Sequence, residues 1–136
     1  MARVFLDANV LFSAAYREGA GLLRLWELSE TDLLTSGYAA EEARRNLTSA
    51  EARSRLEKLL AKVEILVEAP GERLPRSVRL AEKDQPILRA AVAGRATHLL
   101  TGDLRDFGPL FGKRIRGVLI QTPAEFLHHQ PRRRNR

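Results

Sequence analysis

The chain has 136 residues, of which 44% are hydrophobic and 29% charged, a balance typical of one folded domain. It contains no cysteine, which excludes disulfides, thiolate catalysis and cysteine-ligated zinc. No apolar run approaches the ~20 residues that a membrane span needs, so we expect no membrane partner. The start, MARVFLDANVLF, is too short and too soon acidic for a secretory signal. These features favour a cytoplasmic protein, although an exported chain can also lack cysteine.

The formal net charge is +6, and it is concentrated at the C-terminus. Residues 128–136 contain no acid and carry four arginines, so the remainder is only mildly basic. We therefore expect one domain at residues 1–127 and a basic, disordered tail at 128–136. This composition fits a solvated end that aids solubility and equally an arm that binds phosphates without choosing a sequence.

Five short apolar runs, taken in chain order, predict β-strands at residues 3–6, 32–35, 63–67, 98–101 and 118–120. Continuous apolar runs among them are typical of strands covered on both faces. Helical spacing of apolar residues predicts helices at 22–29, 39–47, 52–63 and 87–92, the last ended by Gly94. The alternation predicts an α/β domain with a mostly parallel sheet of about five strands. Residues 69–77, rich in proline and glycine, are expected to form a surface loop.

Several acids fall beyond the carboxyl ends of the predicted strands, where open parallel sheets bind ligands. Asp7 directly follows the first strand. Asp103 follows the fourth strand after one glycine, and Asp106 lies three residues later. Asp84 precedes the helix at 87–92, and Glu42 lies in the helix after the second strand.

Helical geometry favours Glu42 over its neighbour Glu41 as a site residue. At ~100° per residue, the buried stripe of Ala39, Ala43 and Leu47 has Glu42 on its margin and Glu41 pointing to solvent. An acid on the margin can reach a cleft between helix and sheet. Glu42 is therefore the preferred candidate.

Each acid also has a purely structural interpretation. Asp7 and Asp84 could be helix N-caps, Asp103 and Asp106 turn residues, and Glu42 an acid favoured by the helix dipole. Their convergence argues against this, because crowded carboxylates repel each other unless a cation neutralises them. No lysine or arginine falls at an obvious matching strand end. Mg²⁺ or Mn²⁺, which prefer oxygen ligands, would supply that charge.

Four segments in order resemble motifs of the PIN-domain family: VFLDANVL, TSGYAAEEARRNL, EKDQPILRAAV and HLLTGDLRDF. The resemblance spans residues 3 to about 127. It implies a Rossmann-like α/β/α sandwich and a metal-dependent ribonuclease acting on single-stranded RNA. Many small stand-alone members are toxins of VapBC-type toxin–antitoxin pairs, commonly dimeric, which implies an antitoxin partner and a homodimer.

The family's acidic quartet matches Asp7, Glu42, Asp84 and Asp103. Asp106 matches a frequent additional acid, and Asn9 and Thr101 match supporting polar residues. The hypothesis is that the first and last members of the quartet bind Mg²⁺ or Mn²⁺ directly. The other two would bind it through water or hold a second ion.

Basic residues near these motifs are candidates for binding RNA, with a solvated surface as the alternative interpretation. They are Arg44, Arg45, Arg105, Lys113, Arg114 and, in the tail, Arg132, Arg133 and Arg134.

Two other functions compete with the nuclease. Phosphotransfer proteins also place acids at strand ends, but a dehalogenase-type phosphatase needs a second aspartate where this chain has Asn9, and the residue set of a receiver domain is missing. A non-catalytic RNA- or protein-binding module is favoured by the arginine-rich tail. The complete set of acids opposes it.

Overall fold

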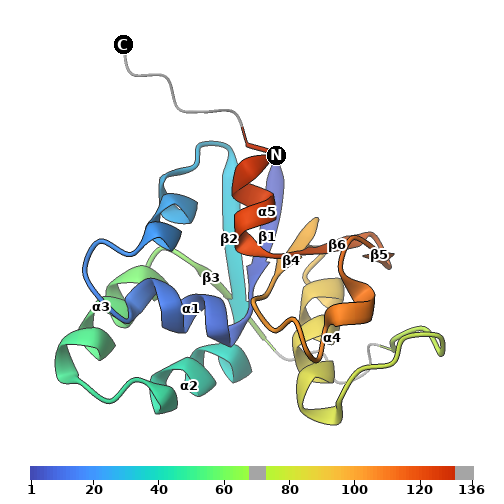
Figure 1. Cartoon of the computed structure of the whole chain (residues 1–136), viewed down its shortest axis with the longest axis horizontal. Helices are drawn as coiled ribbons and strands as arrows, with labels where there is room; N and C mark the ends of the chain where they lie inside the picture. Colours follow the sequence, from blue (N-terminus) through green and yellow to red (C-terminus); the bar gives the residue numbers. More distant parts are fainter. Residues whose placement is uncertain (68–72, 131–136) are drawn as a thin grey trace.

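The computed structural model describes residues 1–67 and 73–130, which form a six-stranded sheet flanked by helices (Figure 1). The strands are β1 (Ala2–Leu6), β2 (Thr31–Ser36), β3 (Glu64–Leu66), β4 (His98–Leu100), β5 (Arg114–Ile115) and β6 (Val118–Gln121). The helices are α1 (Ala8–Ala15), α2 (Gly37–Asn46), α3 (Ala50–Leu60), α4 (Gln85–Ala93) and α5 (Pro123–His128). Three 3₁₀ helices complete this part of the chain, η1 (Gly21–Glu27), η2 (Glu82–Asp84) and η3 (Gly108–Leu110). None of the helices in these residues is long and apolar enough to cross a membrane.

The strand order β3-β2-β1-β4-β6-β5 places β1 in the interior of the sheet. All neighbouring strands are parallel except β5 and β6. The chain extends the sheet from β1 through β2 to β3, and then crosses back to add β4 on the other side of β1. This reversal creates a topological switch point between β1 and β4, where parallel sheets bind ligands. The predicted α/β class with a mostly parallel sheet is confirmed.

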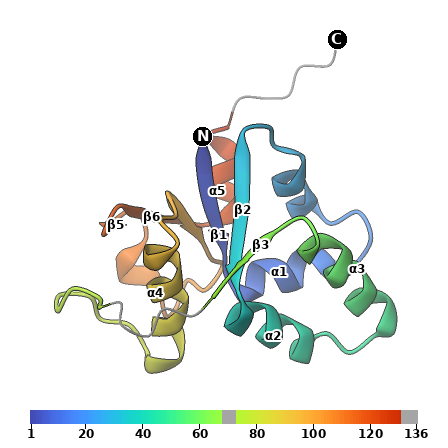
Figure 2. The ribbon, with the colours of Figure 1, turned by 180° about the vertical axis from the view of Figure 1, so that it is seen from behind.

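The apolar strands are covered on both faces, as their continuous hydrophobicity predicts. Successive side chains of β1 alternate between two cores, with Val4 and Leu6 in one and Phe5 in the other. The first core contains residues of α1, α3 and α5, and the second contains the apolar face of α4. Figures 1 and 2 show α1 and α3 on one side of the strands and α4 on the other.

The structure differs from the sequence prediction at several elements. Residues 22–29 do not form an α-helix: the segment is the 3₁₀ helix η1, because apolar spacing over so few residues does not distinguish the two helix types. Strand β5 was not predicted, because two residues are too few to give a pattern. Helix α5 was also not predicted, although Thr122 and Glu125 form a capping box at its start.

The segments expected to be irregular fall partly outside the described residues. In the predicted loop, residues 73–77 contain no helix or strand, and residues 69–72 are not described. Helix α5 continues to His128, one residue into the segment expected to be a tail. Arg132, Arg133 and Arg134 lie outside the described residues.

Phe5 tests the two-core arrangement, because its side chain is fully buried. Phe5→Ala should lower the free energy of unfolding by about 3–5 kcal/mol, through lost burial and a residual cavity. Val67→Ala, at a side chain that is 90% exposed, is the control and should change it by less than about 0.5 kcal/mol. Urea denaturation measures both, and a similar loss in the two variants would contradict the arrangement.

Candidate metal centre

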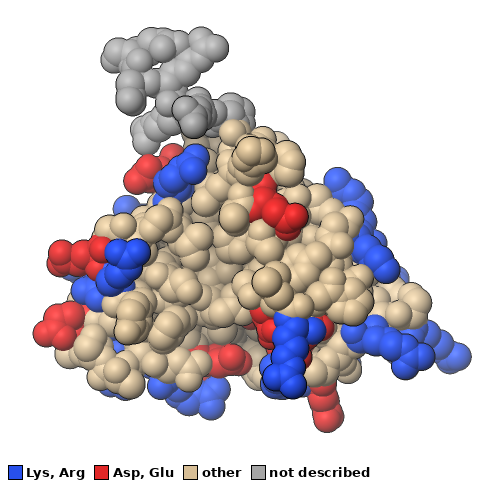
Figure 3. Space-filling view, in the orientation of Figure 1, with Lys and Arg blue, Asp and Glu red and all other residues tan. Residues whose placement is uncertain are grey.

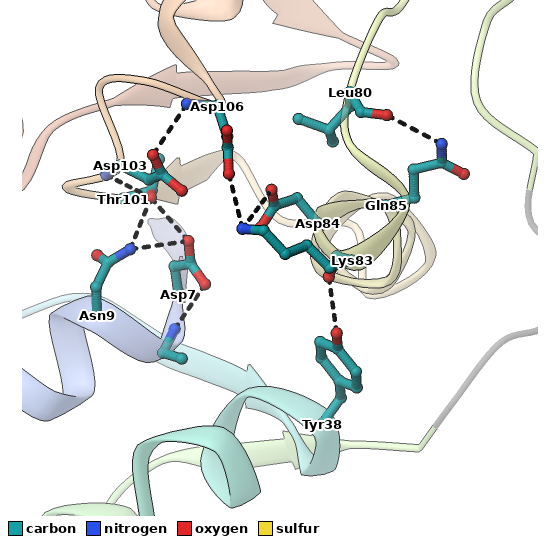
Figure 4. A network of polar contacts seen from close by, with 11 residues as sticks. Asp7, Asn9, Tyr38, Leu80, Lys83, Asp84, Gln85, Thr101, Asp103 and Asp106 are labelled. Carbon is teal, nitrogen blue, oxygen red and sulfur yellow. Dashed lines mark hydrogen bonds and ion pairs between the residues drawn. The ribbon is translucent and has the colours of Figure 1, made fainter. Parts of the chain in front are cut away.

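Most of the predicted site residues meet at the switch point, at the carboxyl ends of β1 and β4, and Figure 4 shows six of them: Asp7, Asn9, Asp84, Thr101, Asp103 and Asp106. Asp7 lies between β1 and α1, and Asn9 lies in the first turn of α1. Thr101 and Asp103 lie in the loop that follows β4, and Asp106 lies further along that loop. This edge of the sheet therefore gathers polar side chains from segments that are far apart in the sequence.

Asp7 is buried, with an exposed fraction of 5%, and its carboxylate is held by three donors. Its Oδ1 accepts a hydrogen bond from the backbone N–H of Ala8 at 2.6 Å. Its Oδ2 accepts from Thr101 Oγ1 at 2.7 Å and from Asn9 Nδ2 at 3.2 Å. Asp7 thus is the N-cap of α1, as its structural interpretation supposed, and it also belongs to a network that joins two strand ends.

Burial raises the pKa of Asp7 from 3.8 to about 6. The hydrogen bonds from Thr101 and Ala8 stabilise the carboxylate and lower this pKa, but the loss of hydration is the larger effect. The negative charges of Asp84 and Glu42 raise the pKa further. A nearby cation would therefore stabilise the ionised form of Asp7 near neutral pH.

Asn9 and Thr101 connect Asp7 to the loop after β4. Asn9 Nδ2 donates to Thr101 Oγ1 at 3.2 Å, and Asn9 Oδ1 accepts from the backbone N–H of Gly102 at 2.8 Å. Thr101 Oγ1 also accepts from the backbone N–H of Asp103 at 3.1 Å. These bonds fix the position of the Asp103 backbone relative to the Asp7 carboxylate.

Asp84, Asp103 and Asp106 form a cluster in which one carboxylate oxygen from each lies within 4.8 Å of the others. We call these three residues the aspartate trio. The backbone N–H of Asp106 donates to Asp103 Oδ1 at 2.9 Å, so Asp103 stabilises a turn as well as belonging to the trio. Asp84 occupies the N-cap position of α4, but its side chain makes no capping hydrogen bond. The interpretation of this carboxylate as a helix cap is therefore wrong. Its carboxylate faces the other two aspartates instead.

Lys83 is the residue of this site that sequence reasoning missed. Its ammonium lies 2.7 Å from Asp106 Oδ2 and 3.2 Å from Asp84 Oδ2 (Figure 4). The sequence offers no basic residue at an obvious matching strand end to neutralise these acids. Lys83 lies instead in the 3₁₀ helix η2. The only signal in the sequence was its position directly before Asp84.

Lys83, Asp84 and Asp106 shift one another's pKa values. Burial raises the pKa of Asp84, and the neighbouring Lys83 opposes that rise. The hydrogen bond from Lys83 lowers the pKa of Asp106, and the same bond raises the pKa of the ammonium. One lysine thus partly neutralises two adjacent carboxylates.

The sequence pattern of the PIN domain family matches residues 3–105, a span that contains Asp7, Glu42, Asp84 and Asp103 and ends one residue before Asp106. The chain belongs to the PIN domain family. VapBC2 from Rickettsia felis, solved bound to a DNA fragment from its promoter, is similar in fold, with a TM-score of 0.65 and 16% sequence identity. That match covers 88% of this chain and 98% of the other.

A second solved structure, VapBC-1 from nontypeable Haemophilus influenzae, has a TM-score of 0.57 and 14% identity. It covers 90% of this chain and 98% of that chain. A search of curated proteins finds no match. At these identities the likeness concerns the fold, and it agrees with the Rossmann-like sandwich expected for this PIN domain.

Glu42 lies at the edge of the PIN site rather than in the trio. It is half-buried on α2 and close enough to raise the pKa of Asp7, whereas Glu41 is exposed. Glu41 instead bonds Arg44 at 3.5 Å. The exposure of these two acids therefore agrees with the helical geometry, which placed Glu41 towards solvent and Glu42 at the margin of the buried stripe.

The described RNA-binding candidates are not equally available. Arg44 Nε donates to Glu57 Oε2 at 2.7 Å, and this bond raises the pKa of Arg44 and lowers that of Glu57. Arg114 lies in β5 opposite Leu119, at the level of the first residue of β4 rather than at its carboxyl end. Arg114 is nevertheless exposed, as are the other described candidates: Arg45, Arg105 and Lys113.

The raised pKa of Asp7 predicts a pH dependence of stability in the metal-free protein. The folded state retains the Asp7 proton up to a pH of about 6, whereas the unfolded state loses it near 3.8, so stability falls as pH rises through this window. Relative to Asp7→Asn, the wild-type free energy of unfolding should fall by about 2–3 kcal/mol between pH 4 and 7. Urea denaturation in chelator measures this, and parallel curves for the two proteins would contradict the assignment.

Thr101 should hold the pKa of Asp7 below the value that burial alone would give. Thr101→Val removes the hydroxyl that donates to the carboxylate, so the titration midpoint of Asp7 should move above about 6. Thr101→Ser keeps the hydroxyl and is the matched control. Carbon-13 NMR titration of the Asp7 carboxyl provides the measurement, and equal midpoints in the two variants would show that the bond has no such effect.

Proposed function

We propose that this PIN domain is a metal-dependent endoribonuclease that hydrolyses phosphodiester bonds in single-stranded RNA. The observation that carries the proposal is the convergence of the Asp7 carboxylate and the aspartate trio at the switch point of the sheet. Phosphodiester hydrolysis needs a cation that stabilises negative charge, and this site supplies oxygen ligands for one. The family membership supports the same class of activity.

The residues present fit a hard divalent cation, Mg²⁺ or Mn²⁺. The trio offers one oxygen from each of Asp84, Asp103 and Asp106 within 4.8 Å, and oxygen ligands without cysteine are the set that these ions prefer. The raised pKa of Asp7 points the same way, because the buried carboxylate lacks a stabilising charge. When bound, such an ion activates water and stabilises charge on the leaving oxygen.

The chain's own residues keep the ligands in place. Thr101 and Asn9 orient the Asp7 carboxylate through Oδ2, and Ala8 holds Oδ1. The turn closed by the Asp106 N–H and Asp103 Oδ1 sets the spacing of the two loop aspartates. Fixed ligands reduce the rearrangement needed when charge develops on the phosphate. Glu42 extends the negative field on the α2 side.

RNA must approach this acidic site past basic side chains. On the face drawn in Figure 3, basic and acidic side chains are interspersed, without one broad patch of either sign. On that face, individual basic side chains near the acids are the candidates for contacting phosphates. Arg105 is exposed and lies in the same loop as Asp103 and Asp106, which favours it over Arg44, whose guanidinium is bonded to Glu57.

We further propose that the nuclease is the toxin of a toxin–antitoxin pair, acting in the cytoplasm as a homodimer bound by an antitoxin protein. The support is the similarity in fold to the two VapBC proteins and the nearly complete coverage of those chains. Co-purification with the product of a neighbouring gene would identify such a partner.

A non-catalytic RNA- or protein-binding module is the second candidate. The ion pairs of Lys83 with Asp84 and Asp106 favour it, because they neutralise part of the cluster without a metal. The carboxylates of Asp7 and Asp103 oppose it. Within the described residues neither forms an ion pair with a lysine or arginine, and a module that only binds RNA gains nothing from negative charge at its binding surface.

Cleavage of labelled single-stranded RNA with Mg²⁺, Mn²⁺ or chelator tests the nuclease. Wild type should cut only with metal, and Asp7→Asn should lower the rate by at least about a hundredfold, because a catalytic carboxylate is lost. Glu42→Gln and Glu41→Gln form a matched pair of neighbouring acids, of which only the first should slow cleavage. RNA binding without cleavage by folded wild type, under any metal condition, would favour the binding module.

A further inference from the structure

We propose that the Lys83 ammonium is a built-in competitor of the divalent cation, occupying carboxylates of the trio until an ion displaces it. The inference rests on the proposed metal-dependent function and concerns the regulation of that site. Its starting observation is that the ammonium bridges two trio members, at 2.7 Å from Asp106 Oδ2 and 3.2 Å from Asp84 Oδ2. These two residues are the part of the trio contributed by η2 and by the end of the loop after β4 (Figure 4).

The Lys83 backbone is anchored close to the cluster. The Tyr38 hydroxyl, from α2, donates to the Lys83 carbonyl at 2.7 Å. Gln85 Nε2 donates to the Leu80 carbonyl at 3.0 Å on the other side of η2. These bonds hold the 3₁₀ turn, so the ammonium remains tethered near Asp84 and Asp106 at a high effective concentration.

The Lys83 side chain is free to leave, because it is 67% exposed. An ammonium at that exposure regains water when it swings out, so its displacement costs little free energy. Asp84, by contrast, has a side chain that is only 11% exposed and keeps its position. The ligand set is therefore fixed, while the competing charge is mobile.

An ion and the ammonium cannot both occupy the trio. Nζ lies 3.2 Å and 3.5 Å from the two oxygens of Asp84 and 2.7 Å from Asp106 Oδ2, so a cation held by these carboxylates would lie next to the ammonium, and two positive charges in contact repel each other. Binding of the ion thus includes the breaking of both ion pairs. The apparent affinity is lowered by the fraction of molecules in which Lys83 blocks the cluster. Lys83 then partly neutralises the trio at low ion concentration, and metal occupies the trio at a higher ion concentration than it would without this lysine.

Isothermal titration of chelator-treated, full-length protein with Mn²⁺ tests this inference. Lys83→Met and Lys83→Gln, two neutral side chains of different polarity, should each bind Mn²⁺ roughly threefold to tenfold more tightly than wild type. Lys58→Met removes the same charge from an exposed position on α3 and should leave the affinity unchanged. Unchanged or weaker binding in both Lys83 variants would overturn the proposal.

A second measurement separates competition from a simple change in fold stability. Without metal, Lys83→Met should unfold at a lower temperature than wild type, because two carboxylates lose their partner. Saturating Mn²⁺ should raise its unfolding temperature by more than it raises that of wild type. Equal shifts in the two proteins would count against competition.

Asp84→Asn distinguishes failure of this inference from failure of the proposed function. If wild type binds Mn²⁺, Asp84→Asn does not, and Lys83→Met equals wild type, the metal site stands and only the role of Lys83 is rejected. If neither wild type nor the Lys83 variants bind Mn²⁺, both the metal site and the competition are rejected.

Discussion

Asp7 lies almost fully buried at the carboxyl end of an interior strand, and the cost of ionising it there constrains the rest of the site. Asp7 lies there because the strand order reverses between β1 and β4, and the carboxyl ends of these two strands form the switch point of the sheet. Apolar cores pack on both faces of β1, and Asp7 at its end is only 5% exposed. The hydrogen bonds from Thr101 and Ala8 stabilise the ionised form of Asp7, whereas the charges of Asp84 and Glu42 destabilise it.

The site has two parts: an inner part, Asp7 with its hydrogen-bond donors, and an outer part, the aspartate trio with Lys83. On the inner side, neutral donors from Ala8, Asn9 and Thr101 stabilise the carboxylate without bringing a charge into the protein. On the outer side, Asp84 is buried while Asp103 and Asp106 are half-buried, and the single charge of Lys83 lies against the carboxylates of Asp84 and Asp106. Two of these donors, Ala8 and Asn9, belong to α1, and the third, Thr101, directly follows β4. The outer part can exchange one cation for another.

Sequence patterns identified the parts of this arrangement that depend on local periodicity. Continuous apolar strands predicted burial on both faces, and Val4, Phe5 and Leu6 show it directly. The same patterns placed the acids at strand ends, because the carboxyl ends of parallel strands share one edge. Strand β5 escaped prediction because it is held by pairing with β6 through a two-residue turn at Arg116 and Gly117, both with positive φ. Its stability comes from the partner strand and not from its own two residues.

Lys83 escaped prediction for a different reason. Its ammonium reaches the acids through a long side chain projected by a 3₁₀ turn, and neither feature leaves a periodic signal in the sequence. The division of the acids into Asp7 and a separate trio likewise depends on how the loop after β4 folds back, which is decided by the Asp103–Asp106 turn. Sequence can therefore name the acids of this site, whereas their grouping follows from tertiary contacts.

Exchange of Lys83 for a divalent cation in the outer part would change the charge that acts on Asp7 in the inner part. At the proposed metal site, a cation that binds the trio would have to separate Lys83 from Asp84 and Asp106 as well as lose part of its own hydration. The charge it brings then lies close to the Asp7 carboxylate, whose pKa already responds to the charge of Asp84. Replacing a singly charged ammonium by a doubly charged ion therefore lowers the cost of ionising Asp7. Occupation of the outer part and ionisation of the inner part are thermodynamically linked, since each makes the other more favourable.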